Sequence, residues 1–463
     1  MIDKKRATKV SKMASVPLVN PNAAGIDVGD TLLTVAVPEG RDTVSLRMFG
    51  AFTGDLRAIS EWLKRCGIET VAMESTGIYW KSLFKVLVHD GFEVYLVNAQ
   101  QTKHVAGRKT DENDAQWIQR LHSYGFLTSS VLPDDQTESL RSLVRFRRTL
   151  IQDRSRYVLR MQKSLEAMNI KLHTVIRDIT GKTGLAIVGA ILAGEREPEH
   201  FMPFVDGHIK ADEDTLKKSL EGIWRPEHLA TLKISYEMYT AVTGQMQECD
   251  RYIERLLCEW TPASQAEHTE RDDRSEQTPD DMPEAMEKET RKRKHKNRPS
   301  FDLRPYLKKI HGVDVLEIYG INEIGALEIF AETGSDLSKW PTENHFVSWL
   351  NFCPNIEITG GKVVSTARLK KKPNLAALSF QHAAVGVQAS DNWLGDYFRR
   401  KRAKGGQKYA MIATARKIST IYYKVVRYKI PFKPIEMTEY KEQYRQTKIA
   451  YFERKLAKLR AAA

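Results

Sequence analysis

One long run of helical periodicity constrains the fold of this chain more than any other feature. From Gln136 onward, apolar residues recur at helical spacing among many arginines. The resulting stripe comprises Leu140, Leu143, Val144, Leu150, Ile151, Val158, Met161, Leu165 and Met168. Further helices are predicted at 214–220 and 226–259, so we expect a helical hairpin or coiled-coil module over 136–260. Its simplest role would be dimerisation.

The segment before this helix has the pattern of an α/β domain. Residues 24–37 cluster β-branched side chains around an Asp-Val-Gly-Asp turn, as in a hairpin that opens a sheet. Two further strands are predicted at 70–73 and 94–97, each after an amphipathic helical stretch. Those stretches are 55–65 and 79–89. We therefore place an α/β domain at about 20–130.

The second half of the chain is divided by a segment that cannot form a core. Residues 261–300 contain almost no large apolar residue, and their basic run at 291–296 is best explained as a solvated charge run. We predict a disordered linker there, then a mainly helical domain at 301–430 and a basic helical tail at 431–463. Residues 320–326 resemble a helix-hairpin-helix turn, which would expose backbone N–H groups suited to a phosphate.

Length and composition limit the class of protein. The chain has 463 residues, which exceeds the usual size of a single core and predicts at least two domains. A net charge of +13 suits a polyanionic partner such as nucleic acid, although charge alone leaves this evenly balanced. The four cysteines form no Cys-x-x-Cys pair, which argues against a zinc ribbon and a disulfide framework. The basic N-terminus lacks the apolar run of a signal peptide, and no long apolar stretch occurs, so we expect a cytoplasmic protein.

Four acidic residues occur in an order that suits metal-dependent phosphoryl transfer. Asp27 lies in the first predicted strand, and Glu74 ends the second. Asp111 and Asp114 are three residues apart, which places both on one helix face. Two-metal phosphoryl transfer needs several carboxylates around Mg²⁺ ions about 4 Å apart. Each residue alone is better explained by a turn or a helix cap, but the combination predicts a Mg²⁺ site.

Several longer segments extend this pattern over most of the predicted folded chain. They are GIDVGDTLL, VAMESTGIYW, RKTDENDAQWIQRLHSYG, WRPEHLATLKISYEMY, and WPTENHFVSWLNFCPN followed by ITGGKVVS. With them the chain resembles transposases of the insertion sequence 110 family. The Trp-Arg-Pro-Glu-His segment at 224–228 and the Gly-Gly-Lys segment at 360–362 indicate the 1111 subgroup.

The resemblance implies an RNA-guided DNA recombinase. Its N-terminal domain would be RuvC-like (RNase H-like), with the DEDD residues Asp27, Glu74, Asp111 and Asp114 binding Mg²⁺. A C-terminal transposase domain would complete the active site with a serine that forms a covalent phosphoserine on DNA. The partners implied are donor and target DNA duplexes and a bridge RNA. Because exchange between two duplexes needs several nucleophiles, we also expect a homo-oligomer, a dimer or a tetramer.

The nucleophile departs from the family pattern. Residues 359–361 read Thr-Gly-Gly where Ser-Gly-Gly is common in the family. Ser365, in the same loop, carries an unhindered primary hydroxyl beside Lys362 and Arg368, and a primary alcohol attacks phosphorus more easily than a β-branched one. We predict Ser365 as the nucleophile and Thr359 as the alternative. The simplest explanation for either hydroxyl is a turn or a cap.

Positive charge clusters in the C-terminal part of the chain, and aromatic residues interleave it. This combination suits phosphate neutralisation together with stacking on exposed bases, although the aromatic residues would equally suit a core. The predicted nucleic-acid contacts are Lys362, Arg368, Lys370, Lys371, Lys372, Arg399, Arg400, Lys404, Lys408 and Arg416. The aromatic residues are Trp393, Tyr397, Phe398, Tyr409, Tyr422 and Tyr423.

Two other functions remain open from the sequence. A RuvC-like, structure-selective nuclease would use only the four carboxylates, with water as the nucleophile. A non-catalytic nucleic-acid-binding protein would use the same carboxylates only to cap helices and to pair with arginines. Mg²⁺-dependent cleavage and a protein–DNA adduct distinguish the three functions. The DNA targets are not visible in the sequence, since a guide RNA would read most bases.

Overall fold

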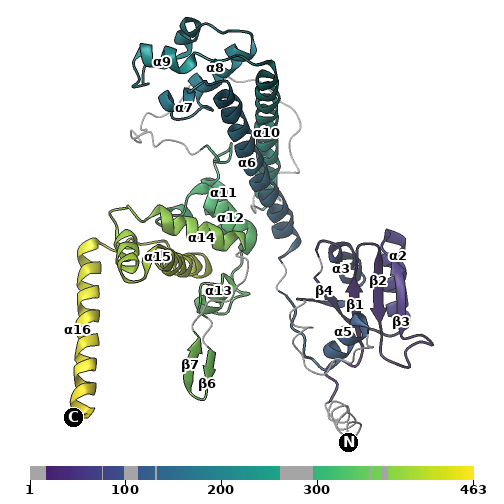
Figure 1. Ribbon diagram of the computed structural model, residues 1–463. Helices are drawn as coiled ribbons and strands as arrows, with labels where there is room; N and C mark the ends of the chain where they lie inside the picture. Colours follow the sequence, from purple (N-terminus) through teal and green to yellow (C-terminus); the bar gives the residue numbers. More distant parts are fainter. Residues whose placement is uncertain are drawn as a thin grey trace, which may run out of the picture. The chain divides into compact units, whose positions relative to one another are not determined.

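The computed structural model divides the chain into two compact units, Met1–Leu132 and Pro133–Ala463 (Figure 1). It describes residues 17–75, 77–98, 113–130, 133–260, 296–354, 357–365 and 374–462. Among the described residues, no helix is both long and apolar enough to cross a membrane.

A five-stranded mixed sheet forms the centre of the N-terminal unit. The strands lie in the order β3-β2-β1-β4-β5, with β1 antiparallel to β2 and parallel to β4. The strands are β1 (Ala23–Val28), β2 (Leu32–Ala36), β3 (Leu46–Gly50), β4 (Thr70–Glu74) and β5 (Glu93–Val97), and the helices are α2 (Thr53–Arg65), α3 (Trp80–His89) and α5 (Asp114–Ser123). The predicted α/β fold is confirmed, and β3 is a strand that the sequence analysis missed.

The two faces of this sheet are covered by different helices. Ile26 and Met73 lie on the face that packs against α2 and α3, where Trp62 and Leu83 complete the core. Ala72 lies on the opposite face, in a smaller cluster with residues of α5. Since successive side chains of a strand alternate between faces, this assignment fixes the direction of every side chain in β1 and β4.

A helical hairpin of α6 (Asp135–Ala167) and α10 (Pro226–Glu259) opens the second unit (Figure 1). The two helices run antiparallel, because Leu140 shares a core with Leu257 while Leu165 shares one with Leu232. Four short helices complete the core that contains Leu165 and Leu232. They are α7 (Leu172–Val175), α8 (Lys182–Leu192), η1 (Pro198–Phe204) and α9 (Glu213–Leu220). Both predicted helices, 214–220 and 226–259, are present, and the apolar stripe of α6 is buried or half-buried against other elements of the same unit.

The arginines of α6 hold the hairpin to its neighbours. Arg147 forms a buried ion pair with Asp250 of α10. Asp250 also accepts a hydrogen bond of 2.9 Å from the backbone N–H of Ser300, and Arg147 donates one of 3.0 Å to the carbonyl of Asn297. Residues 296–300 therefore lie against the hairpin, so the predicted linker ends before residue 296. Its remaining part, 261–295, lies outside the described residues.

The C-terminal part of the second unit is mainly helical. Two buried glutamates of α12 anchor it to α6: Glu332 pairs with Arg145 at 2.8 Å and Glu328 pairs with Arg148 at 3.0 Å. The elements are α11 (Arg304–His311), η3 (Val315–Glu317), α12 (Glu323–Thr333), α13 (Glu343–Trp349), β6 (Glu357–Thr359), β7 (Lys362–Ser365), α14 (Leu375–Gly386), α15 (Trp393–Tyr428) and α16 (Met437–Ala462).

The predicted helix-hairpin-helix turn at 320–326 lies between two helical segments, but the segment just before it is only the short 3-10 helix η3, Val315–Glu317. The side chain of Asn322 caps α12 and accepts a 2.8 Å hydrogen bond from the backbone N–H of Gly325. This internal cap occupies a donor that the sequence pattern assigned to a phosphate.

Candidate active site

The first two predicted acidic residues lie side by side at one edge of the sheet. In the parallel pair of β1 and β4, Ile26 is opposite Met73, so Asp27 and Glu74 occupy the next matched positions. Ile26 and Met73 face α2 and α3, and therefore Asp27 and Glu74 face α5. Both acidic residues are half-buried at the carboxyl ends of their strands. This is the edge at which open α/β sheets usually bind ligands.

A close contact between α5 and β1 brings in the third acidic residue. Gly25 faces α5, and a Cβ at this position would lie only 2.7 Å from the Cα of Gln119. Because Gly25 has no side chain, α5 lies directly on β1. Asn113 caps the helix by accepting a 3.0 Å hydrogen bond from the N–H of Ala115, so α5 begins at Asp114. Gly25 was not predicted from the sequence as a site residue, although a glycine inside a strand indicates such a close approach.

Asp27 and Asp114 interact electrostatically. Burial raises the pKa of the Asp27 carboxyl, and the negative charge of Asp114 raises it further. A hydrogen bond from the backbone of Val28 opposes these two effects only in part. The fold therefore holds two like charges near each other at the sheet edge. A divalent cation would relieve this repulsion, and carboxylate oxygens are the ligands that Mg²⁺ prefers.

The fit to a metal ion rests on these carboxylates. Among the residues that the structure describes, no three acidic, histidine or cysteine side chains gather closely enough to hold an ion. Asp111, the fourth predicted ligand, lies outside the described residues. What the structure brings together is the pair Asp27 and Asp114, with Glu74 beside Asp27 in the sheet register. The donor set is one of hard oxygens, which suits Mg²⁺.

The two candidate nucleophiles belong to a β-hairpin rather than to a loop. Thr359 ends β6 and is paired with Lys362, whereas Ser365 ends β7 and is paired with Glu357. Gly360 and Gly361 form the turn with φ values of 57° and 75°. Two successive residues with positive φ give the tight turn that matches the twist of a hairpin, which explains the Gly-Gly pair. The two hydroxyl-bearing residues are therefore on different strands.

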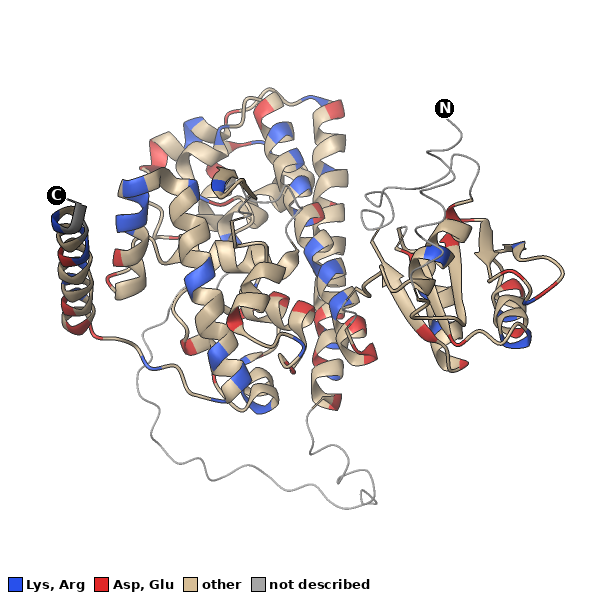
Figure 2. Ribbon diagram, turned by 90° about the horizontal axis from the view of Figure 1, so that it is seen from below, with Lys and Arg blue, Asp and Glu red and all other residues tan. Residues whose placement is uncertain are grey.

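The predicted nucleic-acid contacts differ in how they are used inside the fold. Arg399 donates hydrogen bonds of 3.1 and 3.0 Å to the carbonyls of Gln388 and Ser390, so it holds the end of α14. Arg400 pairs with Asp396 at 2.8 Å. The side chains of Lys362, Lys404, Lys408 and Arg416 are exposed, whereas Arg368, Lys370, Lys371 and Lys372 lie outside the described residues. Figure 2 shows basic residues along the helices of the second unit, interspersed with acidic ones.

Most of the interleaved aromatic residues belong to the core. Trp393, Phe398, Tyr422 and Tyr423 are buried. Tyr423 also donates a 2.7 Å hydrogen bond to the carbonyl of Trp340. These four are therefore not available to stack on bases. Tyr397 is half-buried and Tyr409 is exposed, so both can be reached by a ligand.

Carboxylates at the carboxyl edge of a mixed sheet, in a basic chain, are typical of a metal-dependent nucleic-acid enzyme. Comparison with protein families identifies which kind of nucleic-acid enzyme this is. Residues 24–170 match the IS110 DEDD family model, described as transposase, and residues 314–399 match a second model, described as transposase IS116/IS110/IS902 family. The chain therefore belongs to the IS110 family of transposases. A comparison with curated proteins found no match.

Proposed function

We propose that this transposase belongs to the 1111 subgroup and cuts and rejoins DNA strands through a covalent protein–DNA intermediate, guided by a bridge RNA. Asp27, Glu74, Asp111 and Asp114 are the proposed Mg²⁺ ligands. The observation that carries the proposal is the placement of Asp27, Glu74 and Asp114, the first residue of α5, at the carboxyl edge of the sheet, where burial and then Asp114 raise the pKa of Asp27. The first family match spans all four acidic residues, and the second spans both candidate nucleophiles.

The proposed chemistry divides between the acidic residues and the hydroxyl. Mg²⁺, when bound, neutralises the carboxylates and stabilises the negative charge that develops on the phosphate. The Ser365 hydroxyl oxygen forms a bond to phosphorus as the bond between phosphorus and the leaving deoxyribose oxygen breaks. The serine proton ends on that leaving oxygen. The phosphoserine conserves the energy of the phosphodiester, and a hydroxyl of the second DNA strand then displaces the serine.

The test combines purified full-length protein, RNA transcribed from the flanking DNA, Mg²⁺ and a pair of duplexes. Ser365→Ala should abolish both the protein-linked DNA and the recombinant joints, while Thr359→Ala should retain them. The reverse result would assign the nucleophile to Thr359. Cleavage by both variants without any protein-linked DNA would instead indicate a nuclease that uses water. Binding without Mg²⁺-dependent cleavage would leave only a binding protein.

The RNA and the oligomer are tested separately. The formal net charge of +13 supports a polyanionic partner. Omitting the RNA should abolish recombination but leave the fold intact. Because two duplexes must be exchanged, we expect light scattering to give a dimer or tetramer when RNA is bound. A monomer with and without RNA would contradict this assembly.

A further inference from the structure

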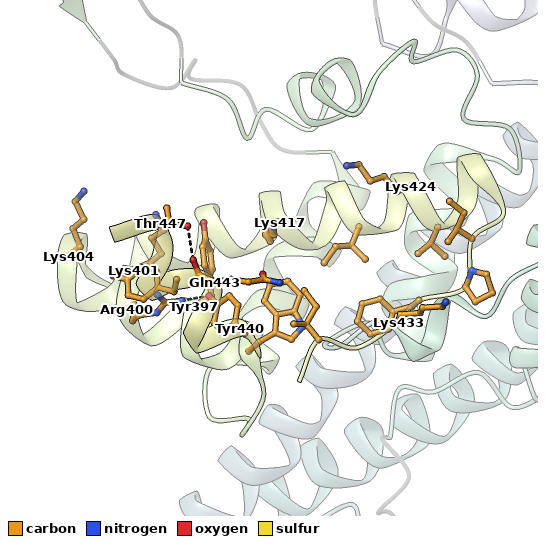
Figure 3. Close-up of a pocket in the computed structure, with 18 residues that line it drawn as sticks. Tyr397, Arg400, Lys401, Lys404, Lys417, Lys424, Lys433, Tyr440, Gln443 and Thr447 are labelled. Atoms are coloured by element: carbon orange, nitrogen blue, oxygen red, sulfur yellow. Dashed lines mark hydrogen bonds between the residues drawn. The ribbon is translucent and has the colours of Figure 1, made fainter. Parts of the chain in front are cut away.

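A groove in the second unit lies between α15 and α16 and has a volume of about 920 Å³ (Figure 3). We call it the α15–α16 groove. Six basic side chains line it: Arg400, Lys401, Lys404, Lys417, Lys424 and Lys433. They come from both halves of α15, on either side of its kink at Gly405–Gly406, and from the segment that leads to α16. Some of these charges were predicted from the sequence, whereas the groove was not.

The positive charge of the groove is only partly neutralised by the protein. No aspartate or glutamate is among its lining residues in the described chain. Lys424 pairs with Glu343 at 3.4 Å, and Arg400 pairs with Asp396 at 2.8 Å. The other four lysines have no carboxylate of the described residues within ion-pair distance. A concave surface of one sign attracts a ligand of the opposite sign, so the groove suits an anion with several charges.

Aromatic rings add a second recognition element. Tyr440 and Tyr444 of α16 enter the groove, and the guanidinium of Arg400 lies 3.7 Å from the ring centre of Tyr444 and 5.0 Å from that of Tyr440. On the opposite wall, the Lys401 ammonium lies 5.2 Å from the ring centre of Tyr397. Tyr444 keeps 39% of its surface exposed. Cations beside partly exposed rings suit a ligand that carries both phosphates and flat bases.

We propose that the α15–α16 groove binds an unpaired nucleic-acid strand. Lys404, Lys417 and Lys433 contact its phosphates, and Tyr440 and Tyr444 stack on its bases. A duplex keeps its base faces inside the stack, so exposed rings in a groove recognise unpaired nucleotides. This inference rests on the proposed function for its choice of nucleic acid as the partner. It adds a strand-binding site that uses neither the carboxylates nor the hairpin hydroxyls.

The first test measures binding of the full-length chain to labelled oligonucleotides of about 20 units. Single-stranded DNA, single-stranded RNA and a duplex are compared by fluorescence anisotropy over a range of salt concentrations. The triple variant Lys404→Gln, Lys417→Gln and Lys433→Gln should bind single strands about tenfold more weakly. Its salt slope should fall by about 2, since each phosphate contact on a single strand contributes about 0.7. The RNA and DNA arms show which strand the groove prefers.

A matched variant controls for the loss of net charge. The exposed residues Lys210, Lys218 and Lys233, on the helical part of the second unit, are changed to Gln together. This variant should bind single strands much more tightly than the groove variant. Equal weakening of the two variants would overturn the proposal, because the effect would then follow charge alone.

The second test addresses the rings. Tyr444→Leu should weaken single-strand binding about tenfold, whereas Tyr444→Phe should retain it, since stacking on one ring contributes about 1–3 kcal/mol. Strands that contain 5-iodouracil should crosslink to peptides holding Tyr440 or Tyr444. Crosslinks only elsewhere, or equal effects on single strands and duplex, would overturn the proposal.

Failure of the groove and failure of the proposed function have different signatures. Asp27→Asn should lose the protein–DNA adduct but keep strand binding in the groove. If the groove variants bind single strands like the unaltered chain while adduct formation persists, only the groove is wrong.

Discussion

One methyl group added at Gly25 tests the geometry of the carboxylate site. An alanine Cβ there would lie 2.7 Å from the Cα of Gln119, and closer still to the backbone N of Gln119 and O of Ala115. Real Cβ atoms essentially never approach a neighbour to less than 3.0 Å. The neighbours are helix backbone, which cannot rotate aside as a long side chain can. Gly25→Ala should therefore push α5 away from β1.

The displacement needed is roughly 1 Å, and overpacking of this kind costs about 1–3 kcal/mol of folding free energy. Asp114 begins α5 and moves with it, so the distance from Asp114 to Asp27 increases. The pKa of Asp27 should then fall toward its ordinary value, because the charge of Asp114 contributes to raising it. A misplacement of about 1 Å in a catalytic group costs on the order of 100-fold in rate.

Urea denaturation and the Mg²⁺-dependent recombination assay measure the two effects on the same preparation. The control is Gly54→Ala in α2, where an added Cβ meets no atom within 4 Å. Alanine at this exposed helix position should leave activity unchanged and stabilise the fold by up to about 1 kcal/mol. Wild-type stability and activity in Gly25→Ala would refute the argument that this contact positions Asp114.

Three further predictions concern charge. Asp27→Asn should raise the melting temperature without Mg²⁺, because a carboxyl with a raised pKa destabilises the fold at pH values above that pKa. It should also remove any rise in melting temperature that Mg²⁺ causes, and scanning fluorimetry measures both effects. Burial lowers the pKa of His122 to about 4, so as the pH falls this residue is protonated in the unfolded chain before it is protonated in the folded one. The free energy of unfolding should therefore fall between pH 6.5 and 4, by about 1.4 kcal/mol per pH unit. Comparing urea curves at pH 7 and 5, His122→Phe should weaken this dependence; an unchanged slope would contradict it. Arg147→Met should lower the free energy of unfolding, measured by urea denaturation, by about 3–5 kcal/mol, because it leaves Asp250 charged and buried. Adding Asp250→Leu should restore much of this stability, and equal losses in the single and double variants would contradict the pairing.

Elements with strong local periodicity were predictable from the sequence. The helix at 226–259 matches α10, because apolar spacing and Pro226 at its first turn both specify a helix locally. The strand β3 was missed because Leu46–Gly50 has no clean alternation and all five residues remain at least partly exposed. As an edge strand, β3 is defined mainly by hydrogen bonds to β2, which the sequence pattern does not show.

The candidate site was predictable in its residue types but not in its geometry. The order of Asp27, Glu74, Asp111 and Asp114 along the chain predicts a metal site, because it combines a strand aspartate, a strand-end glutamate and an Asp-x-x-Asp pair. That Asp27 and Glu74 share a face follows only from the register of β1 with β4. The aromatic residues were less predictable. Trp393 and Tyr422 lie among basic residues in the sequence, as in a surface that stacks on bases, but helix packing buries both side chains.

By itself, the sequence determined most of the elements and the types of side chain that they carry, since spacing, capping and side-chain type are local properties. Tertiary structure decided which residues meet. Gly25 lets α5 approach β1, and this approach brings Asp114 near Asp27. The α15–α16 groove likewise exists only because the first turns of α16 meet α15, where Tyr440 and Tyr444 lie beside Arg400. Such proximity depends on close packing between distant segments, which local periodicity does not encode.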